Sequence, residues 1–419
     1  MTQTEVTPEP EAQPQRKSIL DLSDHNYRVA MINGWLASLG DAFFNGGIVL
    51  ASFAAKLGAP NTVVGLLPSL LGAGSMVPQV FVVPYVSRLP RKLELYQRVA
   101  WLRAGSLWLV VVATFLLGQH PQWLLPVFIF GLAANGLFSG FSSLPFWEVI
   151  AKTVPMERRS GLFSARSLVG GALGFLTGFL VRFILGAPLP FPYTYGIIFL
   201  LGTVFYSACW YVFGQAQEPS DPPVQAEKIS LALPFRDFYF RRFLRVRVLL
   251  AVAGMVEPFY AAFAVRQLKQ TGEIGLYLTI FTLSSVLANL VWVQISRAFG
   301  SKALLLIGAA LGSLTPLMAL LLPPGSYWMV FVLQGSYLAA IGVSTSTYLI
   351  NLAPDDRRSS YIGLSNTLVG LLSFSPVLGG FLADRIGYIG PMLLASICYG
   401  WALYAGRRLR QLETLTKSA

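Results

Sequence analysis

The sequence is poor in charge, in histidine and in cysteine. Only 12% of its 419 residues are charged, which is about half the share in a typical soluble protein. Together with 54% hydrophobic residues, this excludes a soluble enzyme and a disordered protein, and it indicates a chain whose solvent is mostly lipid. The two histidines and two cysteines form no metal-ligand spacing. We therefore expect no disulfide framework, no metal site and no cofactor.

The motifs of nucleotide binding and of nucleophilic catalysis are missing as well. No G-x-x-x-x-G-K-[ST] loop is present, and no Ser/His/Asp or Cys/His combination is available. We therefore expect neither an ATP-driven pump nor a hydrolase, and no catalytic residue. Residues 1–24 are polar and contain proline, without the basic and apolar regions of a signal peptide. They predict a disordered cytoplasmic tail, 1–24.

Long apolar segments fill most of the chain. A helix that crosses a membrane needs about 20 mainly apolar residues. Such segments lie near 28–56, 61–87, 93–118, 122–152, 160–186, 193–214, 246–267, 274–299, 302–322, 326–353, 358–383 and 389–406. The sequence therefore predicts an all-α integral membrane protein with twelve transmembrane helices.

Basic residues are concentrated in every second loop. With the N-terminus inside, nearly all Arg and Lys of the loops fall on the cytoplasmic side, and the opposite side holds little beyond Lys56, Arg266, Lys269 and Arg385. By the positive-inside rule, both termini are expected in the cytoplasm, in a plasma or bacterial inner membrane. This sorting accounts for the net charge of +12 without a nucleic-acid partner.

The segment 215–245 connects the sixth and seventh predicted spans. It begins polar and proline-rich, and it ends in LPFRDFYFRRFLRVR. Aromatic residues interleaved with arginines favour a short helix that lies on an anionic inner leaflet; the alternative is an extension of the seventh span. The predicted parts are a tail 1–24, an N-terminal half 25–214, the linker 215–245, a C-terminal half 246–409 and a tail 410–419.

Three short patterns recur in the two halves, in the same order and at nearly the same offset. FAAK (53–56) recurs as FAVR (263–266), Ser87-Arg88 with Lys92 recurs as Ser296-Arg297 with Lys302, and PMERRS (155–160) recurs as PDDRRS (354–359). Because each half holds six spans, an even number, both halves have the same orientation. An axis along the membrane normal relates such repeats.

On these patterns the chain resembles the major facilitator superfamily of secondary transporters, from about residue 25 to 410. The carrying segments are VPYVSRLPRK (83–92), WVQISRAFGSK (292–302), VPMERRSG (154–161), APDDRRSS (353–360) and GGFLADRIG (379–387). The resemblance implies two six-helix halves, a substrate site between them near the middle of the membrane, and a monomer.

The superfamily also supplies an expectation for the loops. Its loop between spans two and three usually contains an acid, but that position is Ser87 here and Ser296 in the repeat. The carboxylate that would pair the halves is thus absent from both loops. The basic residues that remain are the candidates for cytoplasmic gating: Arg88, Arg91, Lys92, Arg158, Arg159, Arg297, Lys302, Arg357 and Arg358.

Asp41 lies centrally in the first predicted span. An ionisable residue in the middle of a span is costly, and it is therefore a functional candidate. Asn33 and Asn45 stand at multiples of four from Asp41, on about the same helix face. We expect this face to point at a central cavity, with Asp41 binding solute and carrying a coupling proton. The alternative is a structural carboxylate paired with an arginine of another span.

Glu257 in the seventh predicted span is the second candidate carboxylate. It precedes Pro258, where a helix can bend and expose carbonyl groups. Tyr260, one turn further, is placed to contact the same ligand. First and seventh spans line the cavity in the superfamily, so the resemblance supports both Asp41 and Glu257.

Three further polar residues are candidates for the pathway. Arg103, in the third span, is a possible counter-ion of Asp41 or a receptor for an anionic solute. Gln334 and Asn366 are neutral groups that could line the pathway, and hydrogen bonding between helices is their alternative role.

The sequence as a whole predicts a secondary active transporter that moves a small solute by alternating access, coupled to protons, with export favoured over import. Two acidic residues in the cavity favour neutral or cationic, partly apolar solutes. The alternatives are an uncoupled facilitator or sugar/metabolite importer, and a non-transporting membrane receptor or assembly factor. The expected partners are the small solute, protons and a bilayer with anionic inner-leaflet lipids.

Overall fold

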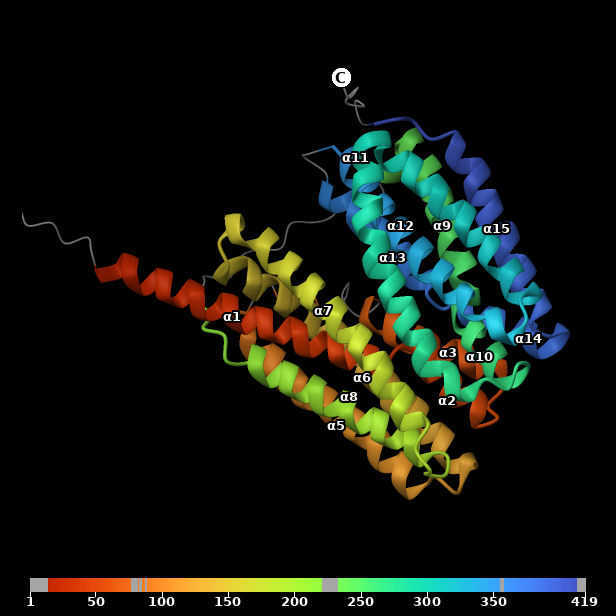
Figure 1. The fold of residues 1–419 in the computed structure, drawn as a ribbon. Coiled ribbons are helices and arrows are strands. Elements are labelled where there is room, and N and C mark those ends of the chain that lie inside the picture. Colours follow the sequence, from red (N-terminus) through yellow and green to blue (C-terminus); the bar gives the residue numbers. More distant parts are fainter. Residues whose placement is uncertain are drawn as a thin grey trace, which may run out of the picture.

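A computed structural model describes residues 14–76, 82, 85–86, 89–220, 233–354 and 358–412. Every regular element in these ranges is helical (Figure 1). The α-helices are α1 (Pro14–Phe43), α2 (Ala51–Lys56), α3 (Asn61–Met76), α5 (Leu93–Leu116), α6 (Pro121–Thr153), α7 (Met156–Leu185), α8 (Tyr193–Phe213), α9 (Phe238–Ala253), α10 (Glu257–Arg266), α11 (Ile274–Leu321), α12 (Trp328–Leu352), α13 (Arg358–Leu372), α14 (Ser375–Ile386) and α15 (Ile389–Arg407). The predicted all-α class is confirmed.

The described residues contain 10 helical segments that are long and apolar enough to cross a membrane. One of them, Thr271–Leu321, has 51 residues and covers two predicted spans, 274–299 and 302–322. The chain turns between these at Gly300, whose φ of 83° and ψ of 163° are not helical. The second predicted span corresponds to α3, of which 16 residues are helical. The described helices thus fit the arrangement expected for twelve spans.

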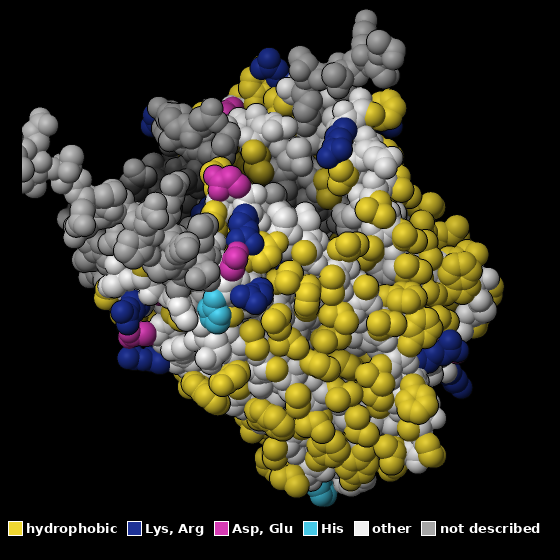
Figure 2. Space-filling view, turned by 60° about the vertical axis from the view of Figure 1, so that its left-hand side comes forward, with side chains coloured by type: hydrophobic (Ala, Val, Ile, Leu, Met, Phe, Trp, Pro, Cys, Tyr) yellow, Lys and Arg dark blue, Asp and Glu magenta, His cyan; other side chains and the backbone are white. Residues whose placement is uncertain are grey.

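Large apolar side chains cover the outside of the protein. Trp101, Leu116, Phe183 and Leu321 are each at least 74% exposed. Figure 2 shows apolar side chains over the lower and right-hand parts of the visible face, whereas most charged side chains lie above them or to their left. An apolar exterior of this extent requires lipid as its solvent, because water would leave it unburied. The protein is therefore an integral membrane protein.

The helices form two bundles, α1 to α8 and α9 to α15. Figure 1 shows them close together where α2, α3, α10 and α14 meet, and apart towards the start of α1 and the end of α15. We call these two ends the far side and the terminal side. One apolar core continues from the first bundle into far-side residues of the second, including Phe259 and Tyr327, whereas a separate core lies within the second bundle. The halves thus pack against each other on the far side.

The first and seventh predicted spans are both interrupted. A π-helix, Gly46–Leu50, separates α1 from α2, and a 3-10 helix, Gly254–Val256, separates α9 from α10. The second interruption directly precedes Glu257 and Pro258. The two interruptions lie in corresponding spans of the repeat, and α10 packs against α2 and the π-helix. Interrupted helices of this kind expose backbone groups near the centre of transporter folds.

The separate interfacial helix expected within 215–245 is not present in the described part of that segment. After a short 3-10 turn, Leu233–Arg236, the helix α9 begins at Phe238 and runs unbroken to Ala253. Asp237 fixes this start, since its Oδ1 accepts the backbone N–H groups of Tyr239 (2.8 Å) and Phe240 (3.2 Å). The aromatic and arginine residues therefore extend the seventh span, which was the second interpretation of this segment.

Candidate functional site

A cavity of about 210 Å³ lies inside the N-terminal bundle. Its lining comes from five helices: Asn33, Ala37 and Asp41 of α1; Tyr96 and Arg103 of α5; Ser139, Ser142, Ser143 and Phe146 of α6; Arg166 of α7; and Tyr206, Cys209 and Trp210 of α8. Each of these helices is apolar enough to cross the membrane. The structure thus brings Asp41 and Arg103, two of the predicted site residues, to the same cavity.

Asp41 is the acidic residue of this lining. Its Oδ1 accepts a hydrogen bond from the Tyr206 hydroxyl of α8, and the guanidinium groups of Arg103 and Arg166 attract its negative charge. The cavity wall therefore carries one carboxylate and two guanidinium groups. With Asp41 ionised, these three groups sum to a net charge of about +1, and protonation of Asp41 raises that sum to about +2.

Arg103 is held against an aromatic wall. Its guanidinium lies 4.3 Å from the ring centroid of Trp210, and one N–H donates to the Ser142 hydroxyl at 3.1 Å. A cation over an aromatic face is attracted by the ring quadrupole, which fixes the orientation of the guanidinium. The buried Nε of Arg103 has no hydrogen-bond partner among the described residues. Among the described contacts, the bond to Ser142 uses one of the five N–H donors of Arg103, which leaves other donors of the guanidinium for a ligand.

Arg166 crosses from α7 to α1. It donates to the Ala30 carbonyl and to Asn33 Oδ1, the latter at 3.1 Å. Asn33 in turn donates to the Cys209 sulfur at 2.9 Å. This approach depends on Gly34, because a Cβ there would lie 2.4 Å from Arg166 Nε. The glycine therefore makes room for the guanidinium beside α1.

Sequence reasoning missed several of these lining residues. Arg166 had a usable signal, since it is an arginine within the apolar run 160–186. Tyr206 and Trp210 had none, because membrane helices contain many aromatic residues that only pack. Their contribution depends on which face of α8 meets α1 and α5, and that is a property of the packed bundle.

The C-terminal predictions fall in a second polar cluster. Glu257 is the first residue of α10, and its carboxyl group interacts electrostatically with Tyr260, Tyr337 and Tyr399. Tyr260 is fully buried, and Gln334 of α12 is 3% exposed. The Oε1 of Gln334 is buried without a hydrogen-bond partner among the described residues, and the Tyr337 hydroxyl lies near those of Tyr260 and Tyr399. None of the five lines the N-terminal cavity.

Asn45 and Asn366 lie outside both groups. Asn45 Oδ1 accepts the backbone N–H of Ile48 at 2.9 Å, so this side chain caps the π-helix between α1 and α2. Asn366 is exposed on α13. Within the described ranges, no group of three or more His, Cys, Asp or Glu side chains comes together to hold a metal ion.

Those basic residues predicted for gating that the structure describes lie on the terminal side, and the contacts described for them stay within the N-terminal bundle. Lys92 pairs with Glu148 at 3.6 Å, and burial together with the nearby Lys152 lowers the pKa of the Lys92 ammonium. Arg158 pairs with Asp24 of α1. Arg159 donates to the Val154 carbonyl at 2.9 Å, at the end of α6. Arg91 and Arg297 are exposed, Lys302 is partly buried, Arg88 and Arg357 lie outside the described residues, and so does the side chain of Arg358.

Polar contacts between the halves occur on the far side. The Asp384 carboxylate of α14 accepts the backbone N–H groups of Asn61 (2.7 Å) and Thr62 (2.9 Å), and the Thr62 hydroxyl at 2.7 Å. Arg266 of α10 donates to Asn61 Oδ1 at 2.7 Å, and the Tyr388 hydroxyl donates to the same oxygen at 2.8 Å. We call these five residues the far-side cluster.

Glycines let the backbones of α3 and α14 touch beside this cluster. A Cβ at Gly65 would lie 2.0 Å from the Pro376 carbonyl oxygen, and one at Gly380 would lie 2.2 Å from the Asn61 carbonyl oxygen. Arg182 and Glu273 form a further ion pair between the halves at 3.4 Å. The far side is therefore closed by direct contact.

Comparison with known proteins shows which family the chain is similar to. A family model, the Major Facilitator Superfamily, matches residues 252–410. A nucleoside transporter has the same fold, with a TM-score of 0.70 and 11% identity over 93% of this chain and 98% of its own. The C-terminal half thus matches the model of the major facilitator superfamily, and the chain as a whole has the fold of a solved transporter. The resemblance read from the loop patterns is thereby confirmed.

A second similar protein was solved in two states. A bacterial homologue of the iron transporter ferroportin in an inward-facing state gives a TM-score of 0.69, with 15% identity over 93% of this chain and 98% of its own. In an outward-facing state the score is 0.59, with 17% identity over 92% and 99%. At such identities the likeness shows the fold alone.

Curated relatives match a smaller part of the chain. An uncharacterised protein of Mycobacterium tuberculosis is 21% identical over 293 residues, which cover 64% of this chain and 55% of the relative. An uncharacterised MFS-type transporter of Methanocaldococcus jannaschii is 26% identical over 136 residues, which cover 32% and 35%. The chain thus spans about half the length of the first relative and about a third of the second.

Proposed function

We propose that the chain is a proton-coupled secondary transporter, which binds a small polar solute in the N-terminal cavity and moves it by alternating access. The observation that carries the proposal is the Asp41 carboxylate in that cavity, beside Arg103 and Arg166. A charged group at this depth of a span is energetically costly, and its presence therefore indicates a function. The guanidinium of Arg103, which uses one of its five N–H donors on Ser142 among the described contacts, supplies donors for the solute.

Asp41 is the proposed site of proton coupling. The Tyr206 hydroxyl and the two arginines stabilise the ionised form of Asp41, whereas its burial favours the protonated form. Protonation of Asp41 changes the net charge of the cavity wall. A proton taken up from one side and released to the other then accompanies each conformational cycle. Glu257 is proposed as a second protonatable group, in the C-terminal half.

Export is the direction that we propose first. A solute that donates hydrogen bonds to the Asp41 carboxylate competes with the proton, so an inward proton gradient drives that solute outward. The second candidate is import of an organic anion together with a proton. It is favoured by the two guanidinium groups of the wall, because protonation of Asp41 makes the cavity more positive and strengthens the binding of an anion.

Both termini are proposed to lie in the cytoplasm, with the protein acting as a monomer. The basic loops support this orientation. So does the packing, since halves that meet on the far side and diverge on the terminal side correspond to an inward-facing state only if the terminal side is cytoplasmic.

A thermal unfolding screen tests the proposed function. The detergent-purified chain is heated with a library of solutes at about pH 6 and about pH 8, beside Asp41→Asn. A solute at 100 times its Kd is expected to stabilise the folded chain by about 2.7 kcal/mol. Stronger stabilisation at the higher pH, lost in Asp41→Asn, supports export; stronger stabilisation at the lower pH supports import of an anion. A ligand that stabilises the chain equally at both pH values, and equally in Asp41→Asn, contradicts coupling through Asp41.

Gly34→Ala is expected to weaken binding of the solute found in that screen about ten-fold. The new Cβ displaces the Arg166 guanidinium from its place beside α1, and the loss of one charge-assisted contact costs at least about 1.5 kcal/mol. Gly105→Ala is the matched control, because no atom lies within 4 Å of a Cβ at that position. Equal affinities of the two variants would show that Arg166 does not contact the solute.

A further inference from the structure

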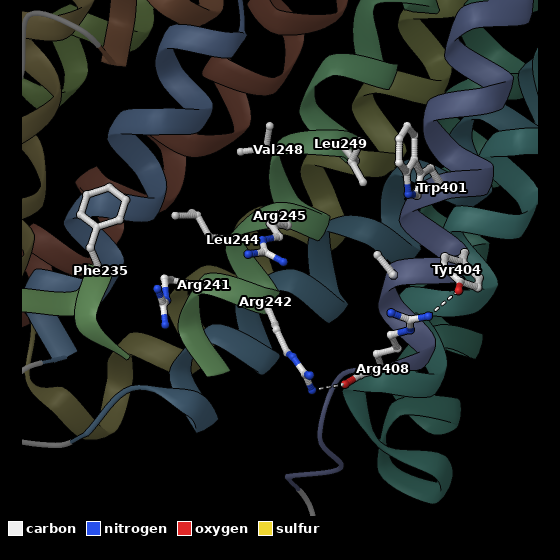
Figure 3. A pocket seen from close by; sticks show the side chains of 11 residues that line it. Phe235, Arg241, Arg242, Leu244, Arg245, Val248, Leu249, Trp401, Tyr404 and Arg408 are labelled. Atoms are coloured by element: carbon white, nitrogen blue, oxygen red, sulfur yellow. Dashed lines mark hydrogen bonds between the residues drawn. The ribbon is translucent and has the colours of Figure 1, made fainter. Parts of the chain in front are cut away.

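A groove between α9 and α15 lies on the side of the C-terminal half that is turned away from the N-terminal half (Figures 1 and 3). Its volume is about 690 Å³. Four arginines line it: Arg241, Arg242 and Arg245 of α9, and Arg408 just after the end of α15. No acidic side chain is among the described residues that line it. The groove is therefore strongly cationic.

The described contacts leave these charges without carboxylate partners. The ion pairs of the described chain are made by other basic residues. Arg242 lies 4.3 Å from the ring centroid of Phe238 and approaches the Arg408 carbonyl at 3.5 Å, while Arg408 donates to the Tyr404 hydroxyl. A guanidinium has five N–H donors, so most donors of the four groups are free of these contacts. Figure 3 shows the two bonds as dashed lines.

Charge and apolar surface follow one another along the groove. Arg241 and Arg242 are in the first turn of α9, whereas Val248 and Leu249 lie about two turns further along, about 10 Å away at 1.5 Å per residue. On α15 the same order holds, with Arg408 at the terminal end and Trp401 two turns deeper. Trp401 is 62% exposed. Figure 3 shows Val248, Leu249 and Trp401 at one end of the groove, whereas Phe235 and Leu244 lie nearer the arginines.

This order of charged and then apolar lining residues matches the layout of a phospholipid. A phospholipid carries its phosphate at the membrane surface and its acyl chains beneath, and an arginine fork suits phosphate oxygens. We propose that the groove binds an anionic phospholipid, with its headgroup phosphate on Arg241, Arg245 and Arg408 and one acyl chain along Val248, Leu249 and Trp401. A free phosphate shares the headgroup chemistry but makes no use of the apolar end.

Native mass spectrometry of the full chain in a neutral detergent tests this site. The chain is titrated with phosphatidylglycerol and with phosphatidylcholine of the same acyl chains. We expect one phosphatidylglycerol to bind at least about ten-fold more tightly. Arg241→Gln with Arg245→Gln is expected to reduce that preference about ten-fold, which corresponds to about 1.4 kcal/mol. Trp401→Ala is expected to weaken the binding of both lipids and to retain the preference for phosphatidylglycerol.

The matched control removes two exposed arginines that do not line the groove, Arg236→Gln with Arg407→Gln. This variant has the same net charge as the test variant and is expected to keep the preference. Loss of the preference in both, or in neither, overturns the proposal. Inorganic phosphate alone forms a further arm, and binding of phosphate as tight as that of the lipid overturns the assignment to a lipid. The thermal unfolding midpoint of each variant shows whether it is folded. If the double variant Arg241→Gln with Arg245→Gln does not fold, the single variant Arg245→Gln is tested in its place.

Discussion

Replacing Asp41 with asparagine is expected to abolish solute accumulation driven by a pH gradient, while downhill exchange of the solute continues. A gradient of one pH unit corresponds to about 1.4 kcal/mol for each proton, and it therefore supports about a ten-fold accumulation when one proton is coupled. Asparagine binds no proton in this range, so the accumulation ratio falls to one. Reconstituted vesicles with an imposed pH gradient and the solute from the unfolding screen give this ratio directly.

The exchange measurement separates a coupling role from a structural one. Asparagine keeps the size of the side chain and an oxygen that can accept the Tyr206 hydroxyl. Asp24→Asn is the matched control, since Asp24 lies on the same helix and pairs with Arg158 at the exposed end; this variant is expected to accumulate solute as the unchanged chain does. Accumulation by Asp41→Asn would contradict proton coupling through Asp41. Loss of both accumulation and exchange would make Asp41 a binding or structural residue.

Hydropathy and loop charge predicted the fold because both follow from the cost of placing polar groups in lipid. That cost fixes the apolar runs and the short loops between them. It does not fix how a helix continues beyond the lipid, and this is why the separate interfacial helix was wrong. The start of α9 depends instead on the Asp237 cap, whose hydrogen bonds form at the first turn of a helix that then extends without a break.

The sequence of a single span shows which charged residues lie in the membrane, and only this part of the candidate site was predictable. Asp41 and Arg103 stand out because charge is rare in apolar runs, and their places on α1 and α5 bring both to one cavity. Glu257 stood out for the same reason, yet its place on α10 puts it in a tyrosine cluster of the other half. Which charges share a cavity depends on helix packing, and a span read alone does not contain that information.

Asp384 shows the same limit on the far side. GGFLADRIG was visible as a superfamily pattern, but the partners of its acid are backbone N–H groups at the start of α3. Any sequence offers such groups at a helix start. What selects Asn61 and Thr62 is the approach of α14 to α3 through Gly65 and Gly380, and those contacts are more than three hundred residues apart in sequence.

Asp384→Asn is expected to shift the conformational equilibrium by roughly 30-fold towards a state that is open on the far side. The carboxylate accepts three hydrogen bonds from Asn61 and Thr62, across the two halves, and it lies at the positive end of α3. An asparagine side chain keeps one acceptor oxygen and loses the charge, so the loss is about 2 kcal/mol. The contacts exist only while the far side is closed, and the variant therefore destabilises that state alone.

Spin labels on the two halves report this shift. Gln119→Cys and Gly325→Cys place labels in exposed loops of the far side, in a background with Cys398→Ser, while Cys209 is buried. Double electron–electron resonance is expected to show a longer distance between the two spin labels in Asp384→Asn than in the unchanged chain. Arg385→Gln is the control, since the contact described for Arg385 is with the ring of Phe381 on its own helix. An unchanged distance distribution in Asp384→Asn would mean that the glycine-mediated contact of α3 with α14 holds the far side closed without the Asp384 carboxylate.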